Sequence, residues 1–126
     1  MSTDFTLEPC QGYVHVRLAP AYALTVASMS RLWSELRAFS QVHGCRSILC
    51  EGVNPKRAMS AGEIYQSGQS LSQELLGFQV ACYWEGYQID QLTDLLKDVA
   101  RNRGVIIQFF ASRDEALHWL GVEGAD

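Results

Sequence analysis

The sequence predicts an α/β fold, with a mixed and mostly parallel sheet of about five strands and about four helices. Short apolar runs typical of strands alternate along the chain with longer stretches whose apolar residues recur at helical spacing. Glycines and helix-capping residues separate these segments, and the connections between them are short. Strands that alternate with helices pair in parallel through right-handed crossovers, so the pattern favours one sheet flanked by helices.

An N-terminal hairpin is expected to add an antiparallel edge to this sheet. Phe5 to Glu8 is a short strand candidate ended by Pro9, and Pro9 to Gly12 is typical of a turn. Tyr13 to Leu18 then alternates between polar and apolar residues, as a half-exposed strand does. This alternation places His15 on the exposed face of the second strand.

The remaining elements follow from helical spacing and capping signals. Helical spacing runs from about Thr25 to His43, and Gly44 supplies a stop. Two further helices are expected to begin with capping boxes at Ser60 and Ser112. The other segments are strands at Ser47 to Glu51, Phe78 to Trp84 and Val105 to Phe110, and a helix that includes Ile89, Leu92, Leu96 and Val99.

Two of these helices carry more specific expectations. Gly62 and Gly68 are expected to weaken the helix that begins at Ser60, because glycine is a poor helix former. In the last helix we expect both Trp119 and Leu120 to be buried.

Length and composition predict a single domain over residues 1–126. The chain has 126 residues and a formal net charge of −4, which disfavours nucleic-acid binding. No apolar run is long enough to span a bilayer, and the N-terminus does not have the composition of a signal peptide. The four cysteines have no C-x-x-C spacing, so we expect free thiols in a cytoplasmic protein, with no metal and no cofactor.

The C-terminal part carries a family resemblance. Ala100 to Gly104, then the strand Val105 to Phe110, then an Ala-x-x-Trp-Leu motif at Ala116 to Leu120 resemble the end of small bacterial SpoIIAA-like proteins. The order of elements is also similar to that of STAS domains over nearly the whole chain. The resemblance implies a SpoIIAA-like, STAS-like fold for the whole chain.

The resemblance implies two different functions. One is a non-enzymatic regulatory or protein-interaction module like the anti-sigma-factor antagonists, whose Asp-Ser-Ser-Gly motif carries a phosphorylated serine. This chain has Met59-Ser60-Ala61-Gly62 at that place, so Ser60 is the candidate phosphorylation site, although the aspartate is missing. The SpoIIAA-like branch is similar to the lipid-carrying CRAL-TRIO fold, which implies a binding module for a small amphiphile or lipid that associates with membranes. A homodimer is compatible with either function.

The candidate binding residues follow two strands of the predicted parallel sheet. Lys56 and Arg57 lie in the loop after one strand, and Trp84 and Tyr87 lie in the loop after the next. Carboxyl ends of parallel strands share one edge, so we expect these residues to face a common concavity beside the backbone N–H groups near Ser60. Basic and aromatic groups together suit an anionic amphiphile or a protein partner. The alternatives are that Trp84 packs on the core and that Ser60 simply caps its helix.

Catalytic and metal-binding patterns are weak in this sequence. Glu51 and Glu85 both follow apolar strands, but no third ligand or histidine with metal spacing lies near them. His43, Cys45 and Cys50 match no zinc-binding spacing. Phosphate-binding loops and the G-x-S-x-G nucleophile motif are not found in the sequence. We therefore expect a protein that is not an enzyme.

Overall fold

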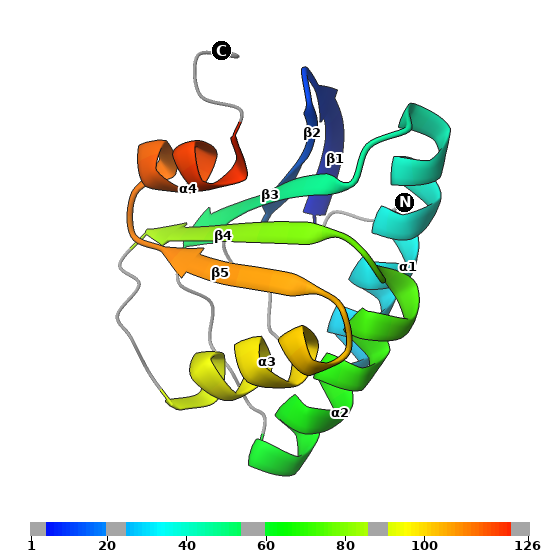
Figure 1. The fold of residues 1–126 in the computed structure, drawn as a ribbon, viewed down its shortest axis with the longest axis vertical. Helices are drawn as coiled ribbons and strands as arrows, with labels where there is room; N and C mark the ends of the chain where they lie inside the picture. The colour runs from blue at the N-terminus through cyan, green and yellow to red at the C-terminus, as the bar shows by residue number, and fades with distance from the viewer. Residues whose placement is uncertain (1–4, 20–24, 54–59, 86–90, 122–126) are drawn as a thin grey trace.

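The computed structural model describes residues 5–19, 25–53, 60–85 and 91–121, which form a five-stranded mixed sheet flanked by four helices (Figure 1). This confirms the α/β class and the mixed sheet expected from the sequence. The elements are β1 (Phe5–Cys10), β2 (Tyr13–Leu18), α1 (Val26–His43), β3 (Ser47–Val53), α2 (Ala61–Glu74), β4 (Gln79–Glu85), α3 (Gln91–Asn102), β5 (Ile106–Phe110) and α4 (Arg113–Leu120).

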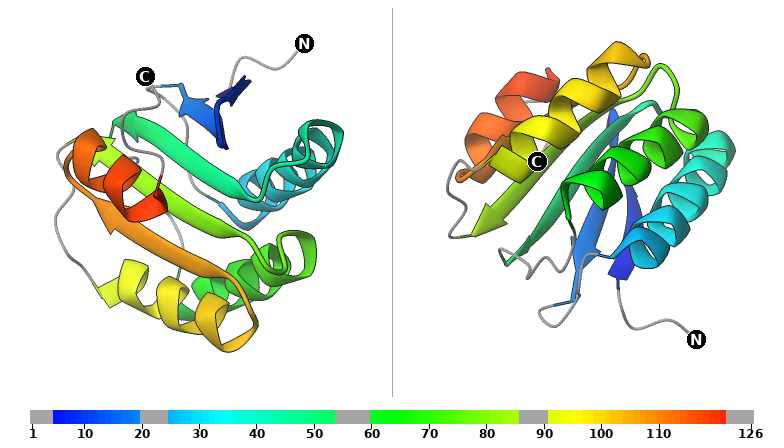
Figure 2. Two further views of the ribbon diagram at one scale, coloured as in Figure 1. Left: turned by 45° about the horizontal axis from the view of Figure 1, so that its top comes forward. Right: turned by 90° about the horizontal axis from the view of Figure 1, so that it is seen from below.

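The order of the strands decides which face of the sheet each helix covers. The strands lie side by side in chain order, with β1 antiparallel to β2 and all later neighbours parallel. Each right-handed crossover therefore advances across the sheet in the same direction and places its helix on the same face. Figures 1 and 2 show α1, α2 and α3 on that face and α4 alone on the other. The second face is thus covered only in part.

Apolar residues of the strands alternate between two cores. The larger core lies between the sheet and α1, α2 and α3, and includes Val14, Ile48, Val80 and Ile107 from four successive strands. The smaller core lies under α4, and its buried residues are Tyr13, Leu49, Ala81, Ala116 and Leu120. Both faces of β3 and β4 are therefore apolar at their centres, which explains why their sequences lack alternation.

The N-caps expected at Ser60 and Ser112 are confirmed, and Thr25 caps α1 in the same way. Thr25, Ser60 and Ser112 each accept a hydrogen bond from the backbone N–H three residues later. Thr25 and Ser60 also form reciprocal capping boxes, with Ser28 and Glu63 respectively, whereas at Ser112 the structure gives only the serine half of the expected box. None of the described helices is both long and apolar enough to cross a bilayer.

Two local expectations were wrong. Pro9 does not end β1 but pairs with Val14 within it, which an edge strand tolerates because a missing N–H can face solvent. Trp119 is only half-buried, although its neighbour Leu120 is buried as expected. Gly68 does not interrupt α2, which is continuous from Ala61 to Glu74. It lies where α2 meets α3, and a Cβ added there would come within 2.6 Å of Val99 Cγ1.

Candidate functional site

Of the residues expected from the sequence to form a binding site, Lys56, Arg57 and Tyr87 lie outside the described residues. Ser60 is exposed at the N-cap of α2, where its Oγ accepts from Glu63 N at 3.2 Å and Glu63 Oε1 accepts from Ser60 N at 3.0 Å. The capping role of Ser60 is therefore confirmed, and its phosphorylation stays a prediction.

The expected loop position of Trp84 was wrong. Trp84 lies within β4 and is only 4 % exposed. Its ring packs against Phe109 at a centroid distance of 5.0 Å, on the face covered by α1, α2 and α3. The two rings help to line an apolar void of only 20 Å³, which is too small for an amphiphile. Trp84 is thus a core residue, as the alternative interpretation held.

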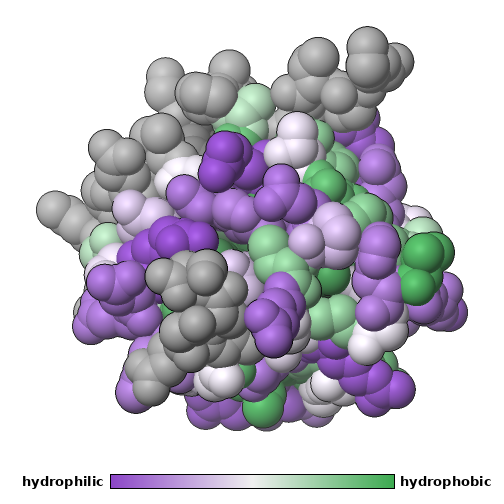
Figure 3. Space-filling view, turned by 90° about the horizontal axis from the view of Figure 1, so that it is seen from above, coloured by the Kyte–Doolittle hydropathy of each residue, from purple (hydrophilic) through white to green (hydrophobic). Residues whose placement is uncertain are grey.

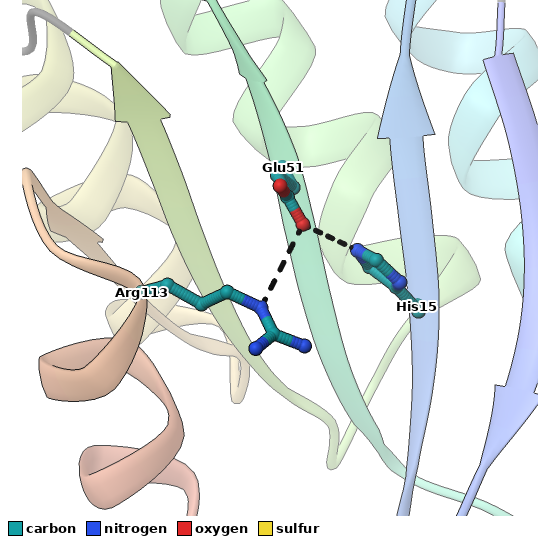
Figure 4. Close-up of polar contacts among 3 residues, drawn as sticks. All are labelled: His15, Glu51 and Arg113. Atoms are coloured by element: carbon teal, nitrogen blue, oxygen red, sulfur yellow. Dashed lines mark hydrogen bonds and ion pairs between the residues drawn. The ribbon is translucent and has the colours of Figure 1, made fainter. Parts of the chain in front are cut away.

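A polar cluster lies on the half-covered face of the sheet. His15 Nε2 is 2.6 Å from Glu51 Oε1, and Arg113 Nε is 3.9 Å from the same oxygen (Figure 4). His15 was expected to be exposed, but its exposed fraction is 8 %. The three side chains come from β2, β3 and the start of α4, and converge on one carboxylate.

The strand register explains why His15 and Glu51 meet. In the parallel pair of β2 and β3, His15 is opposite Leu49 and Arg17 is opposite Glu51. Residues two apart on one strand share a face, so His15 and Glu51 are diagonal neighbours on the face opposite the larger core. The sequence signal was present in the alternation of β2, but it required knowledge of which strand pairs with which.

The hairpin extends this cluster toward β1. Glu8 is opposite His15 and Cys10 is opposite Tyr13, all on the same face. Burial, followed by a hydrogen bond with Cys10, raises the pKa of Tyr13 above its ordinary value of 10.0. The nearby charge of Arg113 acts in the opposite direction. The phenol therefore stays neutral at ordinary pH.

The contact with Glu51 determines which nitrogen of the His15 ring carries the proton. A contact of 2.6 Å between Nε2 and a carboxylate oxygen requires Nε2 to carry a proton. In the neutral ring Nδ1 is then the acceptor, free to bind a proton or a metal ion.

Seen from the side of α4, hydrophilic residues surround only small groups of hydrophobic ones (Figure 3).

A second candidate site lies at the opposite end of the sheet, where the parallel strands begin. A groove of 570 Å³ lies between the C-terminal ends of α1 and α2. We call it the amino-edge groove; it is lined by Arg37, Ser40, Gln41, Gly44, Cys45, Arg46, Gln73, Glu74, Leu76 and Phe78. A neighbouring hollow of 390 Å³ shares Arg46 and Phe78 with it and extends to Ile106.

Charged and apolar groups meet in the amino-edge groove. Arg37 Nη1 is 3.4 Å from Glu74 Oε1, whereas Arg46 is exposed and has no ion-pair partner among the described residues. Leu76 is 66 % exposed, and Phe78 is half-buried. The groove thus combines one unneutralised guanidinium with an apolar wall.

The groove also contains a buried hydroxyl. Ser40 Oγ is inaccessible to solvent and has no hydrogen-bond partner in the described part of the chain. Its backbone carbonyl, in contrast, accepts from Gly44 N and from Cys45 N at 3.1 Å. These hydrogen bonds satisfy a carbonyl at the C-terminal end of α1. They therefore reduce the negative partial charge that the helix places beside the groove.

From the sequence a binding site was expected at the carboxyl edge of the sheet, and the amino-edge groove was not expected. Its residues lie at helix ends, where Arg46, Leu76 and Phe78 look like ordinary flanking residues. Only the packing of α1 against α2 brings them together.

No protein-family model and no curated protein sequence matches this chain. The SpoIIAA-like and STAS-like resemblance therefore stays a hypothesis.

Proposed function

We propose that the protein is a non-enzymatic binding module whose ligand is a small amphiphile with a single anionic head. The observation that carries this proposal is the amino-edge groove, where the exposed guanidinium of Arg46 lies beside Leu76 and Phe78. Its volume of 570 Å³ falls within the range of about 300–1,000 Å³ typical of small-molecule sites. A guanidinium pairs well with a carboxylate or phosphate, and the apolar wall can bury a hydrocarbon body.

The ion pair between Arg37 and Glu74 limits the charge of the head group that the groove can bind. Because these two side chains neutralise one another, the net charge offered to a ligand comes from Arg46. A single anionic group is therefore matched, whereas a dianionic head would need a second unpaired cation.

Binding of dodecanoate and of the uncharged dodecanol, measured by titration calorimetry, tests this proposal. Arg46→Gln should weaken dodecanoate binding by about tenfold or more, because a hydrogen bond to a charged group is lost. The same substitution should leave dodecanol binding nearly unchanged.

Arg17→Gln is the matched control, because Arg17 is exposed on β2 and lies outside the groove. An equal loss of dodecanoate binding in both variants would show only a general effect of net charge. Failure of the wild-type protein to bind either compound would contradict the proposal.

A protein partner is the second candidate, and it retains the regulatory role expected from the family resemblance. Val42, Leu76 and Ile106 are 79 %, 66 % and 51 % exposed, and all lie near the ends of elements at the amino edge. Exposed apolar side chains beside an arginine are typical of interaction surfaces. Native mass spectrometry of protein purified from its own cells separates the candidates, since it distinguishes a bound small molecule from a bound protein or a second copy.

A further inference from the structure

The hairpin of β1 and β2 carries three side chains of the kinds that bind transition metals. Glu8, Cys10 and His15 each offer one ligand atom, and these atoms all lie within 4.8 Å of one another. In a tetrahedral zinc site with bonds of about 2.0–2.3 Å, ligand atoms are separated by roughly 3.3–3.8 Å. The three side chains therefore need only small rotations to reach a common ion.

The backbone fixes this grouping without any loop. Glu8 and Cys10 are two residues apart on β1 and share a face, while His15 lies directly opposite Glu8 on β2. The sequence Glu8-x-Cys10 on one strand is thus combined with a histidine on the next through the hairpin register. Gly12, with a φ of 88°, closes the turn that sets this register.

Glu51 supplies the outer partner that a metal-bound histidine needs. Its carboxylate holds His15 Nε2 at 2.6 Å, and this leaves Nδ1 as the nitrogen available to a metal. Figure 4 shows the contact between His15 Nε2 and Glu51, with Arg113 on the other side of the same carboxylate. Such a carboxylate orients the ring and increases its basicity as a ligand.

We propose that Glu8, Cys10 and His15 form a zinc site, with Glu51 as the positioning residue for His15. Thiolate, imidazole and carboxylate are the ligands that Zn²⁺ takes, and softer or harder ions match the mixture less well. The Zn²⁺ charge is balanced by the thiolate and the Glu8 carboxylate, while Arg113 balances Glu51. Glu8 is exposed and Cys10 half-buried, so a fourth position is open to water.

A cysteine nucleophile activated by His15 is the competing interpretation of the same cluster. That interpretation uses Cys10 and His15 and gives the Glu8 carboxylate no role. With a metal present, the same carboxylate becomes a ligand. The zinc site therefore accounts for all three side chains, whereas a nucleophile accounts for two. The proposal departs from the expectation of no metal, and it is independent of the amino-edge groove.

The test begins with Co²⁺, which reports both thiolate ligation and tetrahedral geometry in its absorption spectrum. Metal-free protein should develop a sulfur-to-cobalt charge-transfer band at one equivalent, and one equivalent of Zn²⁺ should remove it. Cys10→Ser should abolish the band. Cys45→Ser should retain it, because the thiol of Cys45 donates to Ser47 O at 3.6 Å outside the cluster.

Absence of a thiolate band in the wild-type protein, or its equal loss in Cys45→Ser, would overturn the proposal. Cys10 and Glu8 lie at the accessible side of the site, so their variants should fold normally; far-UV circular dichroism and thermal melting without metal check this. If Cys10→Ser nevertheless unfolds, alkylation of the wild-type protein decides. Zn²⁺ should protect Cys10 from iodoacetamide, and unchanged labelling would overturn the proposal.

The role of Glu51 has its own measurement. Glu51→Gln should weaken Zn²⁺ binding by about 10–100-fold, as loss of an outer-shell partner does, while the cobalt thiolate band persists. Glu35→Gln on α1 removes an exposed carboxylate on the opposite face of the sheet from the three proposed ligands and should change nothing. Equal affinities of the Glu51 and Glu35 variants would show that Glu51 has no positioning role.

Discussion

At the scale of single residues, Ser40 Oγ is a buried polar atom without a hydrogen-bond partner among the described residues, as is Trp33 Nε1. A buried hydroxyl without a partner costs free energy that a methyl group would not. Ser40 lines the amino-edge groove, but its Oγ is closed off from solvent, so this cost belongs to the fold and not to the ligand.

Ser40→Ala tests this cost. The substitution should raise the free energy of unfolding of the ligand-free protein by about 1 kcal/mol, because an unsatisfied polar group is removed. It should leave dodecanoate binding unchanged, because a ligand in the groove does not reach an atom that solvent does not reach. Urea denaturation and calorimetry measure the two effects. A clear loss of stability would show that Ser40 Oγ has a stabilising partner, and weaker binding would show that the hydroxyl contacts the ligand.

Among the secondary-structure elements, the contact between α2 and α3 depends on Gly68. A Cβ at this position would lie 2.6 Å from Val99 Cγ1 and 3.0 Å from Val99 Cβ, so the two helices approach more closely than any other residue permits. The glycine that lowers the helix propensity of α2 is therefore the one that allows its packing.

Gly68→Ala should lower the free energy of unfolding by about 1–3 kcal/mol, because the helices must separate or Val99 must move. Gly62→Ala is the matched control in the same helix, since its added Cβ would meet only Ser60 Oγ at 3.9 Å. That variant should be neutral or more stable by up to about 1 kcal/mol. Chemical denaturation of both proteins decides, and equal effects would mean that close packing does not explain Gly68.

The secondary-structure elements also show how much of the structure could be predicted from the sequence. Helices and strands were predictable because apolar spacing and caps are local, as at Ser60 and Ser112. Contacts between elements were not, because they depend on register and on which helices are neighbours. The pair of His15 with Glu51 and the groove beside Arg46 both belong to this second kind. Trp84 shows the same difficulty, since an aromatic residue near a strand end suits a loop and a core equally.

At the scale of the whole molecule, the stability of the sheet should decrease from its centre to the β1 edge. β3 pairs with a strand on each side and carries fully buried residues on both faces, whereas β1 pairs with β2 alone. Amide hydrogen exchange should therefore be slowest at Leu49 and Cys50 and fastest in β1, which opens without global unfolding. Comparable exchange rates in β1 and β3 would contradict this gradient. Zn²⁺ should slow exchange in β1 if it joins the two strands of the hairpin.

The order of strands in the sheet has a further consequence for biosynthesis. Because the strands are adjacent in chain order, each new strand leaving the ribosome finds its hydrogen-bonding neighbour already made. The sheet can therefore grow strand by strand from β1 to β5. During this growth α1, α2 and α3 pack on one of its faces. Leu49 and Ala81 on the other side stay without cover until α4 emerges last. Nascent chains halted between β4 and α4 should thus be the ones that chaperones bind most strongly.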